Sequence, residues 1–425
     1  MNYYSSLFQK INKKTAKIGI IGLGYVGLPL TLQFSKKKFE VLGFDIDIEK
    51  INLLNNNKSY IKHISSKIIK RNRKNLTFTS SFNQISKVDI IILCLPTPLT
   101  LNLKPDLSYI KKTMLKIKRY LENGKLIILE SSTYPGSTKD LILPFLKKFK
   151  VGHNFFVGYS PEREDPNNKK YNLENIPKIC SGYSTYCKKL TSHLYKKILK
   201  KVKNVTDINV AEFVKLYENI YRSVNIGLVN ELKIVATELG LNIYEIIDAA
   251  KTKPFGFQAF YPGPGVGGHC IPIDPYYLSW ISKKKGINTK LIYEAGKINS
   301  KMPKWIISKT LEKTNLKKVL LVGVAYKKGV DDTREAPAID FIKQLTRKNV
   351  KTDYYDPNVK FLKSRKLSKV YKSIVLNKKL LPKYNCVFII TDHNQINYNL
   401  IKKYSKLIVD TRNVYTEENK KILKF

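Results

Sequence analysis

The segment GPGVGGHCIPID, residues 263–274, contains the residue types that most directly suggest chemistry in this chain. Four glycines within six positions let backbone amides approach a ligand, and they present Cys270 on a constrained turn. A thiolate there suits the trapping of an aldehyde, because it adds to the carbonyl carbon and forms an intermediate that can be oxidised and hydrolysed. Asp274 would orient a water molecule or the thiol. The competing interpretation is a buried, inert cysteine, which is the usual state of a free cysteine.

Lys215 and Asn219 form a second set of residues suited to catalysis. They are four positions apart in a stretch with apolar residues at helical spacing, so they share one face of a predicted helix. An ammonium group and an amide that point at the same atom can stabilise an alkoxide or a tetrahedral oxyanion. Taken alone, such a pair is more often a solvated helix face.

Three glycines spaced as GxGxxG, Gly22, Gly24 and Gly27, indicate a dinucleotide site. They follow the apolar run KIGII and precede a helical pattern, the context in which helix N-terminal amides hold a pyrophosphate. Asp45 ends the next predicted strand, where a carboxylate accepts hydrogen bonds from ribose hydroxyls and repels a 2′-phosphate. Thr97, in Pro-Thr-Pro after the third predicted strand, lies where this topology places further cofactor contacts. The pattern predicts NAD rather than NADP as the cofactor.

The elements that must position these residues belong to two α/β regions joined by a helical one. Residues 17–205 alternate β-branched runs with amphipathic stretches, and the alternation returns after residue 317, so the two regions could be distant relatives. Between them, residues 207–239 predict one long helix. We therefore expect an N-terminal Rossmann domain (1–205), a central helical segment (206–316) and a C-terminal Rossmann-like domain (317–425).

Composition bounds the partners and the compartment. The formal net charge of +44 would suit nucleic acid or an anionic membrane, but the lysines are scattered along the chain, so the charge assigns no partner beyond favouring an acidic substrate such as a nucleotide diphosphate. The longest apolar runs are only about as long as a strand, so we expect no membrane span. The N-terminus lacks the pattern of a signal peptide, so we expect no secretion by that route. Five cysteines without zinc-site spacing predict no metal and a reducing cytoplasm.

Six segments together resemble the UDP-glucose/GDP-mannose dehydrogenase family in order and spacing, over nearly the whole chain. They are GLGYVGLP (22–29), PTP (96–98), SPER (160–163), AEFVKLYENIYRSVNIGLVNEL (211–232), FYPGPGVGGHCIPIDPYYL (260–278) and GVAYKKGVDDTREAPA (323–338). Within the family, residues 253–275 look most like the UDP-N-acetylglucosamine 6-dehydrogenases that serve surface polysaccharide synthesis. The enzyme acting on UDP-N-acetylgalactosamine is the near alternative, and those for UDP-N-acetylmannosamine or UDP-glucose are more distant.

The resemblance implies catalytic roles for six residues. Cys270 would be the nucleophile, and Lys215 and Asn219 would stabilise the oxyanion. Asp274 would activate water or hold Lys215. Glu162 and the hydroxyl of Ser132 would relay protons during thioester hydrolysis.

The resemblance also implies ligand contacts and a homodimer. The residues expected at NAD are Gly22, Gly24, Tyr25, Val26, Gly27, Asp45, Thr97 and Ser132, with Arg334 reaching a cofactor across the dimer interface. Those expected at the nucleotide sugar are Glu162, Arg163, Lys215, Asn219, Arg222, Tyr261, Gly263, Gly267, Lys327 and Arg412. The long apolar helix would form the dimer contact.

Two departures from the family pattern and one rival function qualify these expectations. Glu130-Ser131-Ser132 stands where the family has Glu-Ser-Thr, which keeps a hydroxyl but loses the methyl that restrains it. Pro166-Asn167 stands where Pro-Gly is usual, and asparagine tolerates the backbone that glycine adopts. The rival is a nucleic-acid-binding protein that has kept the fold and lost catalysis, motivated by the charge alone.

Overall fold

The computed structural model describes residues 2–62, 64–100, 102–163, 171, 173–417 and 419–425. Contacts divide the chain into two compact units, the first comprising residues 1–218 and 276–285 and the second residues 219–275 and 286–425. Each unit contains a mainly parallel sheet with helices packed on it, so the predicted α/β fold class is confirmed. The finer division into three domains stays a prediction.

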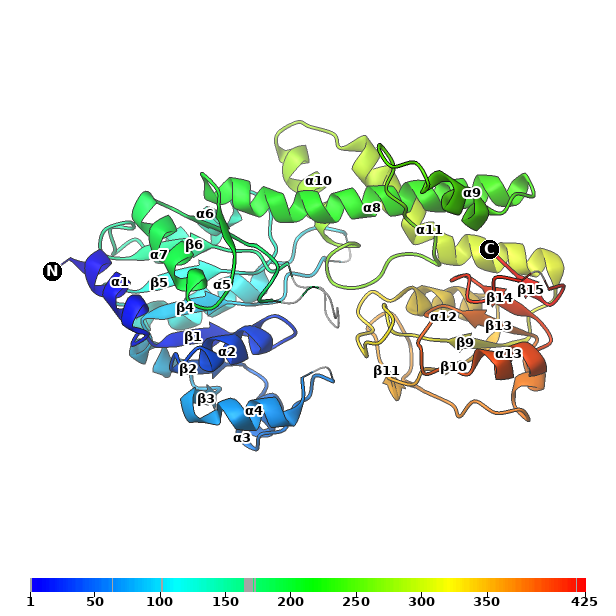
Figure 1. The fold of residues 1–425 in the computed structure, drawn as a ribbon, viewed down its shortest axis with the longest axis horizontal. Helices are drawn as coiled ribbons and strands as arrows, with labels where there is room; N and C mark the ends of the chain where they lie inside the picture. Colours follow the sequence, from blue (N-terminus) through cyan, green and yellow to red (C-terminus); the bar gives the residue numbers. More distant parts are fainter. Residues whose placement is uncertain (1, 63, 101, 164–170, 172, 418) are drawn as a thin grey trace. The chain divides into compact units, whose positions relative to one another are not determined.

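The first unit is built on an eight-stranded sheet of order β3-β2-β1-β4-β5-β6-β7-β8. Its strands are β1 (Ile18–Ile21), β2 (Val41–Phe44), β3 (Leu76–Thr79), β4 (Ile90–Leu93), β5 (Leu126–Leu129), β6 (Phe156–Tyr159), β7 (Lys178–Gly182) and β8 (Val202–Asn204). The order from β3 through β6, entirely parallel, is that of a doubly wound nucleotide-binding sheet (Figure 1).

The parallel arrangement predicted for this region is interrupted once. Strand β7 pairs antiparallel with β6 through Gly158–Gly182 and Tyr159–Ser181 and then pairs parallel with β8. An antiparallel neighbour at this position means that the sheet is mixed at this edge and parallel from β3 to β6. The sequence did not identify β3, β7 or β8.

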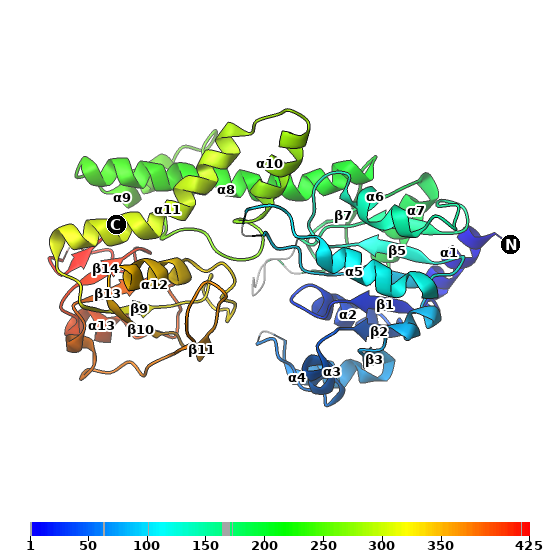
Figure 2. The same ribbon diagram turned by 180° about the vertical axis from the view of Figure 1, so that it is seen from behind.

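Both faces of this sheet are covered by helices, because alternate strand residues enter opposite cores. Ile18 and Ile20 pack with helices α1, α2 and α7, whereas Ile21 packs with α5 and α6. Figure 2 views the molecule from behind and brings α5 in front of the strands. The helices of this unit are α1 (Tyr3–Lys13), α2 (Gly27–Lys36), α3 (Ile48–Asn55), α4 (Ser66–Asn72), α5 (Ser108–Ile117), α6 (Ser137–Ile142) and α7 (Thr185–Lys196).

The predicted long helix is confirmed as α8 (Ile208–Glu238), whose 31 residues run from the first unit into the second. Gly227 interrupts an otherwise bulky helix for a steric reason. A Cβ at this position would lie 2.9 Å from the Cβ of Ala295 in α11 (Lys290–Lys313), so the absent side chain lets the two helices approach closely. The other helices at this end of the chain are α9 (Ile243–Ala250) and α10 (Asp274–Lys284).

The second unit contains a five-stranded parallel sheet of order β10-β9-β13-β14-β15. Its strands are β9 (Lys318–Val322), β10 (Lys351–Tyr355), β13 (Cys386–Ile389), β14 (Ile408–Asp410) and β15 (Ile422–Leu423), with β11 (Phe361–Leu362) and β12 (Tyr371–Lys372) forming a separate antiparallel pair. Helices α11 and α12 (Pro337–Arg347) share one core of this sheet, and α13 (Tyr398–Tyr404) packs on the other face.

The two sheets repeat one local design. Gly22 follows β1 with a positive φ and donates its amide to the carbonyl of Phe44, and Gly323 follows β9 with a positive φ and donates to the carbonyl of Tyr355. The order β2-β1-β4-β5 in the first sheet corresponds to β10-β9-β13-β14 in the second. This correspondence supports the expectation that the two α/β regions are distant relatives.

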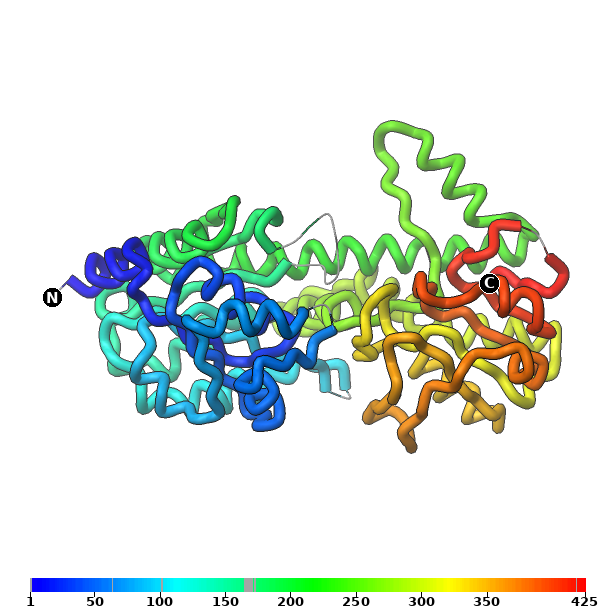
Figure 3. The backbone as a smooth tube through the Cα atoms, turned by 60° about the horizontal axis from the view of Figure 1, so that its bottom comes forward, coloured from blue at the N-terminus to red at the C-terminus, as the bar shows by residue number. Residues whose placement is uncertain are grey.

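The chain turns back after α8 within the second unit. Ile243 and Ile247 of α9 pack on Ala236 of α8, and Figure 3 shows the green tube of α9 and the following residues extending away from the end of α8.

Among the described residues, no helix combines the length and apolar character that crossing a membrane requires.

Candidate active site

Steric surroundings explain why glycine stands at Gly22 and Gly27 of the N-terminal motif, whereas Gly24 has open space beside it. A Cβ on Gly22 would lie 2.4 Å from the carbonyl oxygen of Cys94, and one on Gly27 would lie 1.8 Å from the carbonyl oxygen of Gly22. A Cβ on Gly24 would meet nothing within 4 Å. Gly22 and Gly27 are therefore required by the fold itself, while the space at Gly24 is open for a ligand, as the division of roles in a pyrophosphate-binding turn requires.

Asp45 lies at the carboxyl end of β2 and supports this turn from beside it. Its Oδ2 accepts a hydrogen bond of 2.9 Å from the amide of Leu23, and its side chain keeps a small exposed surface. Tyr60 donates its hydroxyl to the carbonyl of Leu23, and burial, together with the charge of Asp45, raises the pKa of this phenol. The carboxylate is thus held at the rim of the turn, where a ribose would lie.

The remaining residues predicted at the cofactor lie close to the same strand ends. Val26 immediately precedes α2, and Tyr25 is half-buried against the core. Thr97 is buried, and its carbonyl accepts a hydrogen bond of 3.0 Å from the hydroxyl of Tyr277 in α10.

A buried ion cluster lies at the carboxyl ends of β5 and β6. The ammonium of Lys178 is 3.0 Å from Glu130 Oε2 and 3.1 Å from Glu162 Oε2, and Tyr195 donates its hydroxyl to Glu130. Burial would lower the pKa of Lys178, but the two carboxylates outweigh it and raise that pKa. Burial raises the pKa of Glu130, against the charge of Lys178. Glu162, predicted from the sequence, is therefore oriented by Lys178, which the sequence did not single out.

Glu212 of α8 fixes the helix that bears Lys215. Its buried carboxylate accepts hydrogen bonds from the amides of Gly136 and Thr138, at 2.5 and 2.8 Å, and from the hydroxyls of Ser137 and Thr138. These donors form the first turn of α6, so the carboxylate satisfies amides that have no partner within that helix. Lys215, nearly one turn further along α8, is held buried by the same docking.

The hydroxyl segment after β5 contains three candidates, and two of them are engaged. Ser131 bridges the amide and the carbonyl of Leu95, and Thr133 accepts from Ser137. Within the described part of the chain, no hydrogen bond involves the hydroxyl of Ser132, which is half-buried. Of the three, Ser132 is the hydroxyl for which the described residues provide no hydrogen-bond partner, and its role at the site stays a prediction.

In the second unit, Cys270 lies at the start of a turn that leads into α10. Its carbonyl accepts hydrogen bonds of 3.0 and 2.8 Å from the amides of Ile273 and Asp274, and its thiol is half-buried. By contrast, Cys180, Cys187 and Cys386 are buried. Cys94 shares the intermediate exposure of Cys270, but burial raises the pKa of the Cys94 thiol, so exposure separates Cys270 only from the three buried thiols.

Asn219 and Asp274 are brought together by this turn. Asn219 Nδ2 donates to Asp274 Oδ2 at 2.5 Å, and Asn219 Oδ1 accepts from the guanidinium of Arg222. Both bonds fix the plane of the buried amide and leave the second hydrogen of Nδ2 for another acceptor. Asp274 therefore contacts Asn219 within this unit.

The glycine-rich segment rests on residues 326–336. A Cβ at Gly267 would lie 2.8 Å from the Cβ of Tyr326, and the amide of Gly268 donates to the carbonyl of Arg334 at 3.0 Å. Burial and the guanidinium of Arg334 lower the pKa of His269, which keeps this neighbour of Cys270 neutral. Arg334 itself forms an ion pair with Asp332 at 2.6 Å. Lys327, on the same segment, is half-buried.

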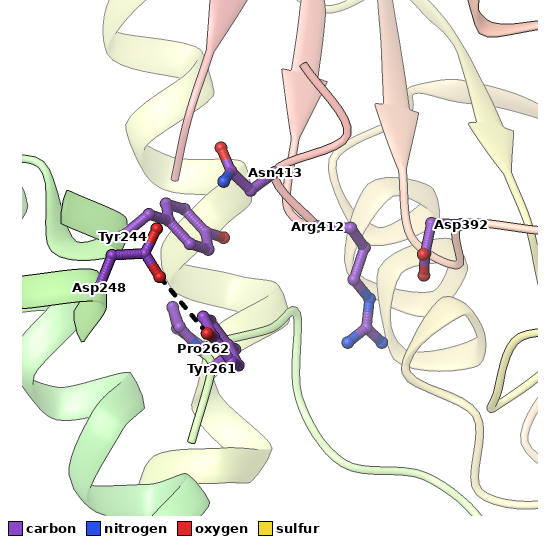
Figure 4. Close-up of a pocket in the computed structure, with 7 residues that line it drawn as sticks. All are labelled: Tyr244, Asp248, Tyr261, Pro262, Asp392, Arg412 and Asn413. Carbon is purple, nitrogen blue, oxygen red and sulfur yellow. Dashed lines mark hydrogen bonds between the residues drawn. The ribbon is translucent and has the colours of Figure 1, made fainter. Parts of the chain in front are cut away.

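A cavity of about 330 Å³ opens beside Arg412 in the second unit (Figure 4). It is lined by Tyr244, Asp248, Tyr261, Pro262, Asp392, Arg412 and Asn413. Arg412 Nε donates to the carbonyl of Ile390 at 2.8 Å, and burial lowers the pKa of its guanidinium. The opposite end of the guanidinium lies 2.8 Å from the place a Cβ of Gly263 would take. Tyr261 and Arg412, both predicted from the sequence, thus line one cavity, and Gly263 lies against the Arg412 guanidinium.

Some predicted residues have other partners, and some lie outside the description. Arg163 forms an ion pair of 2.6 Å with Glu218 and donates to the carbonyl of Pro177, so its predicted contact with the sugar stays a prediction. Pro166 and Asn167 lie outside the described residues. Lys215, Glu162 and Ser132 belong to the first unit, whereas Cys270, Asn219, Asp274, Arg222, Lys327 and Arg334 belong to the second.

Sequence reasoning missed Lys178, Glu212 and the cavity residues Tyr244, Asp248 and Asp392. Lys178 had one usable signal, since a lysine that opens the apolar run KICSG is unusual in a buried strand. Among 77 lysines and arginines that signal is weak.

Three family models match the chain in sequence. They describe the NAD binding domain of the UDP-glucose/GDP-mannose dehydrogenase family at residues 16–199, its central domain at residues 209–301 and its UDP binding domain at residues 320–417. Together they cover most of the chain.

Individual proteins agree with these models. The UDP-N-acetyl-D-glucosamine 6-dehydrogenase of Pseudomonas aeruginosa is 35% identical over 81% of this chain and 83% of its own. The UDP-N-acetyl-D-mannosamine dehydrogenase of Pyrococcus horikoshii is 34% identical over 94% and 96%. A solved structure of a UDP-D-ManNAc dehydrogenase from Pyrococcus horikoshii matches with a TM-score of 0.84 and 32% identity, covering 96% of this chain and 97% of that one.

Substitution of Gly24 and of Gly27 by alanine separates ligand binding from folding. Gly24→Ala should change the free energy of unfolding by no more than about 0.5 kcal/mol and weaken NAD binding at least about tenfold, because its methyl group takes the space of the pyrophosphate. Gly27→Ala should lower the free energy of unfolding by about 2 kcal/mol or more, because its methyl group meets the Gly22 carbonyl. Urea unfolding and titration calorimetry with NAD measure both. Unchanged NAD affinity in Gly24→Ala would contradict the assignment.

Lys178→Met tests the buried ion cluster. It should lower the free energy of unfolding by about 3–5 kcal/mol at pH 8, because Glu130 is left as an unpaired buried charge. The pKa of Glu130, already raised, would rise further, so the loss should shrink as pH falls toward 5 and the carboxyl takes up a proton. Lys189→Met, at an exposed position of α7, is the control. A loss that does not depend on pH would argue against the unpaired charge as its cause.

Proposed function

The chain belongs to the UDP-glucose/GDP-mannose dehydrogenase family, and its relatives named above are UDP-sugar dehydrogenases. We therefore propose that it oxidises C6 of UDP-N-acetylglucosamine from alcohol to carboxylate with NAD as the acceptor. The observation that carries this proposal is the half-buried Cys270 on its glycine-rich turn, four residues before Asp274, which orients Asn219. The product, a UDP-linked uronate, would serve surface polysaccharide synthesis. The five cysteines, which lack the spacing of a zinc site, support a reducing cytoplasm as the compartment.

The cavity beside Arg412 supports a nucleotide-sugar substrate. The half-buried guanidinium of Arg412 donates to the protein only from Nε within the described residues, so its outer nitrogens can bind an anionic or hydroxyl-rich ligand. The tyrosines and Pro262 supply flat apolar surface, and Asp248, Asp392 and Asn413 supply acceptors. Gly263, Gly267 and Lys327 would complete the contacts to the nucleotide sugar.

In the first oxidation, the C6 hydroxyl would pass its proton to a water molecule, and the chain's own groups would hold the oxygen that remains. Lys215 and the second hydrogen of Asn219 Nδ2 would donate to this oxygen, and Asp274 would keep the amide oriented. When bound at the Gly24 turn, NAD supplies the acceptor for a hydride in each of two oxidations. Gly22, Tyr25, Val26, Gly27, Asp45, Thr97 and Ser132 would hold it there.

Cys270 would then take up the aldehyde. Its thiolate adds to C6, a carbon–sulfur bond forms and the carbonyl oxygen becomes the oxyanion of a thiohemiacetal, held by the same two donors. Loss of a second hydride from C6 leaves a thioester on Cys270. Two electron pairs have then left one carbon.

Hydrolysis would return the enzyme to its starting state. Water adds to the thioester carbon, the carbon–sulfur bond breaks, and the uronate leaves as the thiolate reforms. Glu162 would take the proton of the attacking water, with the hydroxyl of Ser132 holding that water. Lys178 supports this assignment, because its ammonium holds the Glu162 carboxylate in place.

A homodimer is proposed from the exposed face of α8. Seven large apolar side chains, spaced by three, four or seven residues, are exposed along it: Val210, Phe213, Tyr217, Tyr221, Leu228, Leu232 and Val235. A helical stripe of this length is costly to leave in water, and a second copy would cover it. In such a dimer Arg334 would reach the cofactor of the partner.

UDP-N-acetylmannosamine is the second candidate substrate, because the Pyrococcus horikoshii relative named for it matches this chain over more of its length. UDP-N-acetylgalactosamine and UDP-glucose are the further alternatives.

A panel of UDP-N-acetylglucosamine, UDP-N-acetylmannosamine, UDP-N-acetylgalactosamine and UDP-glucose tests the substrate. We expect UDP-N-acetylglucosamine to be preferred and two NADH to form per sugar consumed, measured by absorbance and by chromatography of the product. Preference for another sugar would replace the substrate, and one NADH per sugar would rule out the four-electron reaction.

Cys270→Ala tests the covalent route. Removing the thiol should lower the rate of uronate release by about a thousandfold or more, since nucleophile removal in other enzymes has effects of this order. NAD affinity should stay unchanged, because the glycine turn is intact. Cys187→Ala is the matched control at a buried thiol. Uronate release at the wild-type rate would show that no bond to Cys270 forms.

Leu232→Glu tests the dimer. Light scattering of the wild-type protein should give about 98 kDa, twice the 49.0 kDa of one chain, and the variant should give one chain's mass because its charge enters the interface. Val375→Glu, at another exposed apolar position, should remain dimeric. A wild-type mass of one chain would exclude the dimer.

A further inference from the structure

His393 and Asp356 form a fully buried pair in the second unit, next to the loop that contacts the glycine-rich segment before Cys270. His393 Nε2 is 3.1 Å from Asp356 Oδ2, and neither side chain has exposed surface. Asp356 also accepts hydrogen bonds from four backbone amides, those of Val324, Ala325, Asn358 and Val359. Burial would raise the pKa of Asp356, but the hydrogen bond from His393 and these amides outweigh it and lower that pKa, so Asp356 is a carboxylate.

The protonation of His393 follows from its partners. A carboxylate only accepts, so Nε2 carries the hydrogen that points to Asp356. A backbone amide only donates, so Nδ1 is bare and accepts from the amide of Gly329 at 3.1 Å, with the amide group of Asn358 also at 3.1 Å. The neutral ring thus connects Asp356 at one end to Gly329 at the other.

Gly329 belongs to the segment on which the catalytic turn rests. Residues 323–336 form the loop that follows β9. Asp356 binds the amide of Val324 at the start of this loop, and Gly329 lies in its middle. The amide of Tyr326 donates to the carbonyl of Asp332 at 2.9 Å and closes the loop. Asp332 holds Arg334, and the carbonyl of Arg334 accepts from the amide of Gly268. Gly268 is two residues before Cys270.

Glu335, near the end of this loop, has a strained backbone conformation. Glu335 has a φ of 49°, in the left-handed region that side-chain-bearing residues rarely occupy. Its carbonyl oxygen lies 2.9 Å from the place a Cβ of Gly267 would take. A strained residue in contact with the catalytic turn persists only where its surroundings hold it in place.

We propose that His393 is a positioning residue for Cys270, which acts by accepting the Gly329 amide and thereby fixing residues 326–336 beneath the catalytic turn. The proposal rests on the proposed function for the role of Cys270, but the fixing of the turn is a property of the protein without substrate. In this proposal the bond from the Gly329 amide to His393 Nδ1 fixes the loop, and the bond from His393 Nε2 to Asp356 only orients the ring.

Two substitutions separate the two ends of the ring. Asparagine places its amide oxygen near the position of Nδ1, and glutamine places its amide nitrogen near the position of Nε2. His393→Asn therefore keeps an acceptor for the Gly329 amide and loses the contact with Asp356, while His393→Gln does the reverse. His193→Gln, which alters a histidine of the first unit that stacks on Phe8, is the control.

Hydrogen exchange of the full chain without ligands, read in a peptide covering residues 262–272, is the first measurement. We expect His393→Gln to accelerate exchange there at least about tenfold and His393→Asn to stay within about threefold of the wild type. Equal exchange in all variants, or a larger effect in His393→Asn, would overturn the proposal. Because both variants lose one hydrogen bond, comparable urea midpoints show that global unfolding is not the cause.

Turnover with the preferred UDP-sugar is the second measurement. His393→Gln should lower kcat about tenfold with the KM for NAD unchanged, and His393→Asn should keep most of kcat. An equal loss in kcat and in NAD affinity would indicate a merely structural histidine and overturn the positioning role. If the wild-type protein oxidised no UDP-sugar, the proposed function would fail while the exchange experiment would still decide whether His393 fixes the turn.

Discussion

Close approach of backbone to backbone, without side chains between, is the constraint on which both units depend. At the end of β1 the carbonyls of Cys94 and Gly22 occupy the space that side chains on Gly22 and Gly27 would need, and at the end of β9 the carbonyl of Thr391 lies 2.1 Å from a Cβ built on Gly323. Parallel strands end at one edge of a sheet, so the loops that leave them must share a small volume there. Glycine at these positions lets that edge form, and the edge is where ligands bind in such sheets.

Near these strand ends, in both units, each of three buried charged side chains is surrounded by several hydrogen-bond or ion-pair partners. Lys178 meets two carboxylates, Glu212 meets the amides and hydroxyls of one helical turn, and Asp356 meets four amides and one imidazole. Losing one partner from such a set costs far more than a surface ion pair contributes. These residues therefore give the side chains around them single positions, and the side chains they position include Glu162, Lys215 and the segment beneath Cys270.

The two sheets place a carboxylate at equivalent positions and use it differently. Asp45, after β2, keeps part of its surface exposed at the rim of a turn with open space at Gly24. Asp356, after β10, has no exposed surface, because His393 covers it and amides of the loop take both oxygens. Both oxygens of Asp45 also accept backbone amides, those of Leu23 and Asp47, so the difference between the two carboxylates is that His393 covers Asp356 and no ring covers Asp45 within the described residues. In the proposed function Asp45 would in addition accept ribose hydroxyls, while Asp356 would act only through the loop that it holds.

The sequence by itself determined the parts of this protein whose chemistry is local. Neighbours in the chain specify the GxGxxG turn, the acidic residue after β2, the long helix and the cysteine among glycines. Glycine spacing, strand length and helical periodicity are short-range properties. Tertiary structure alone decided the partners of Lys178, Glu212 and His393, as well as the antiparallel pairing of β7 with β6. Each of these depends on partners tens to hundreds of residues away, and a lysine or a glutamate in the sequence looks the same whether water or a buried carboxylate lies beside it.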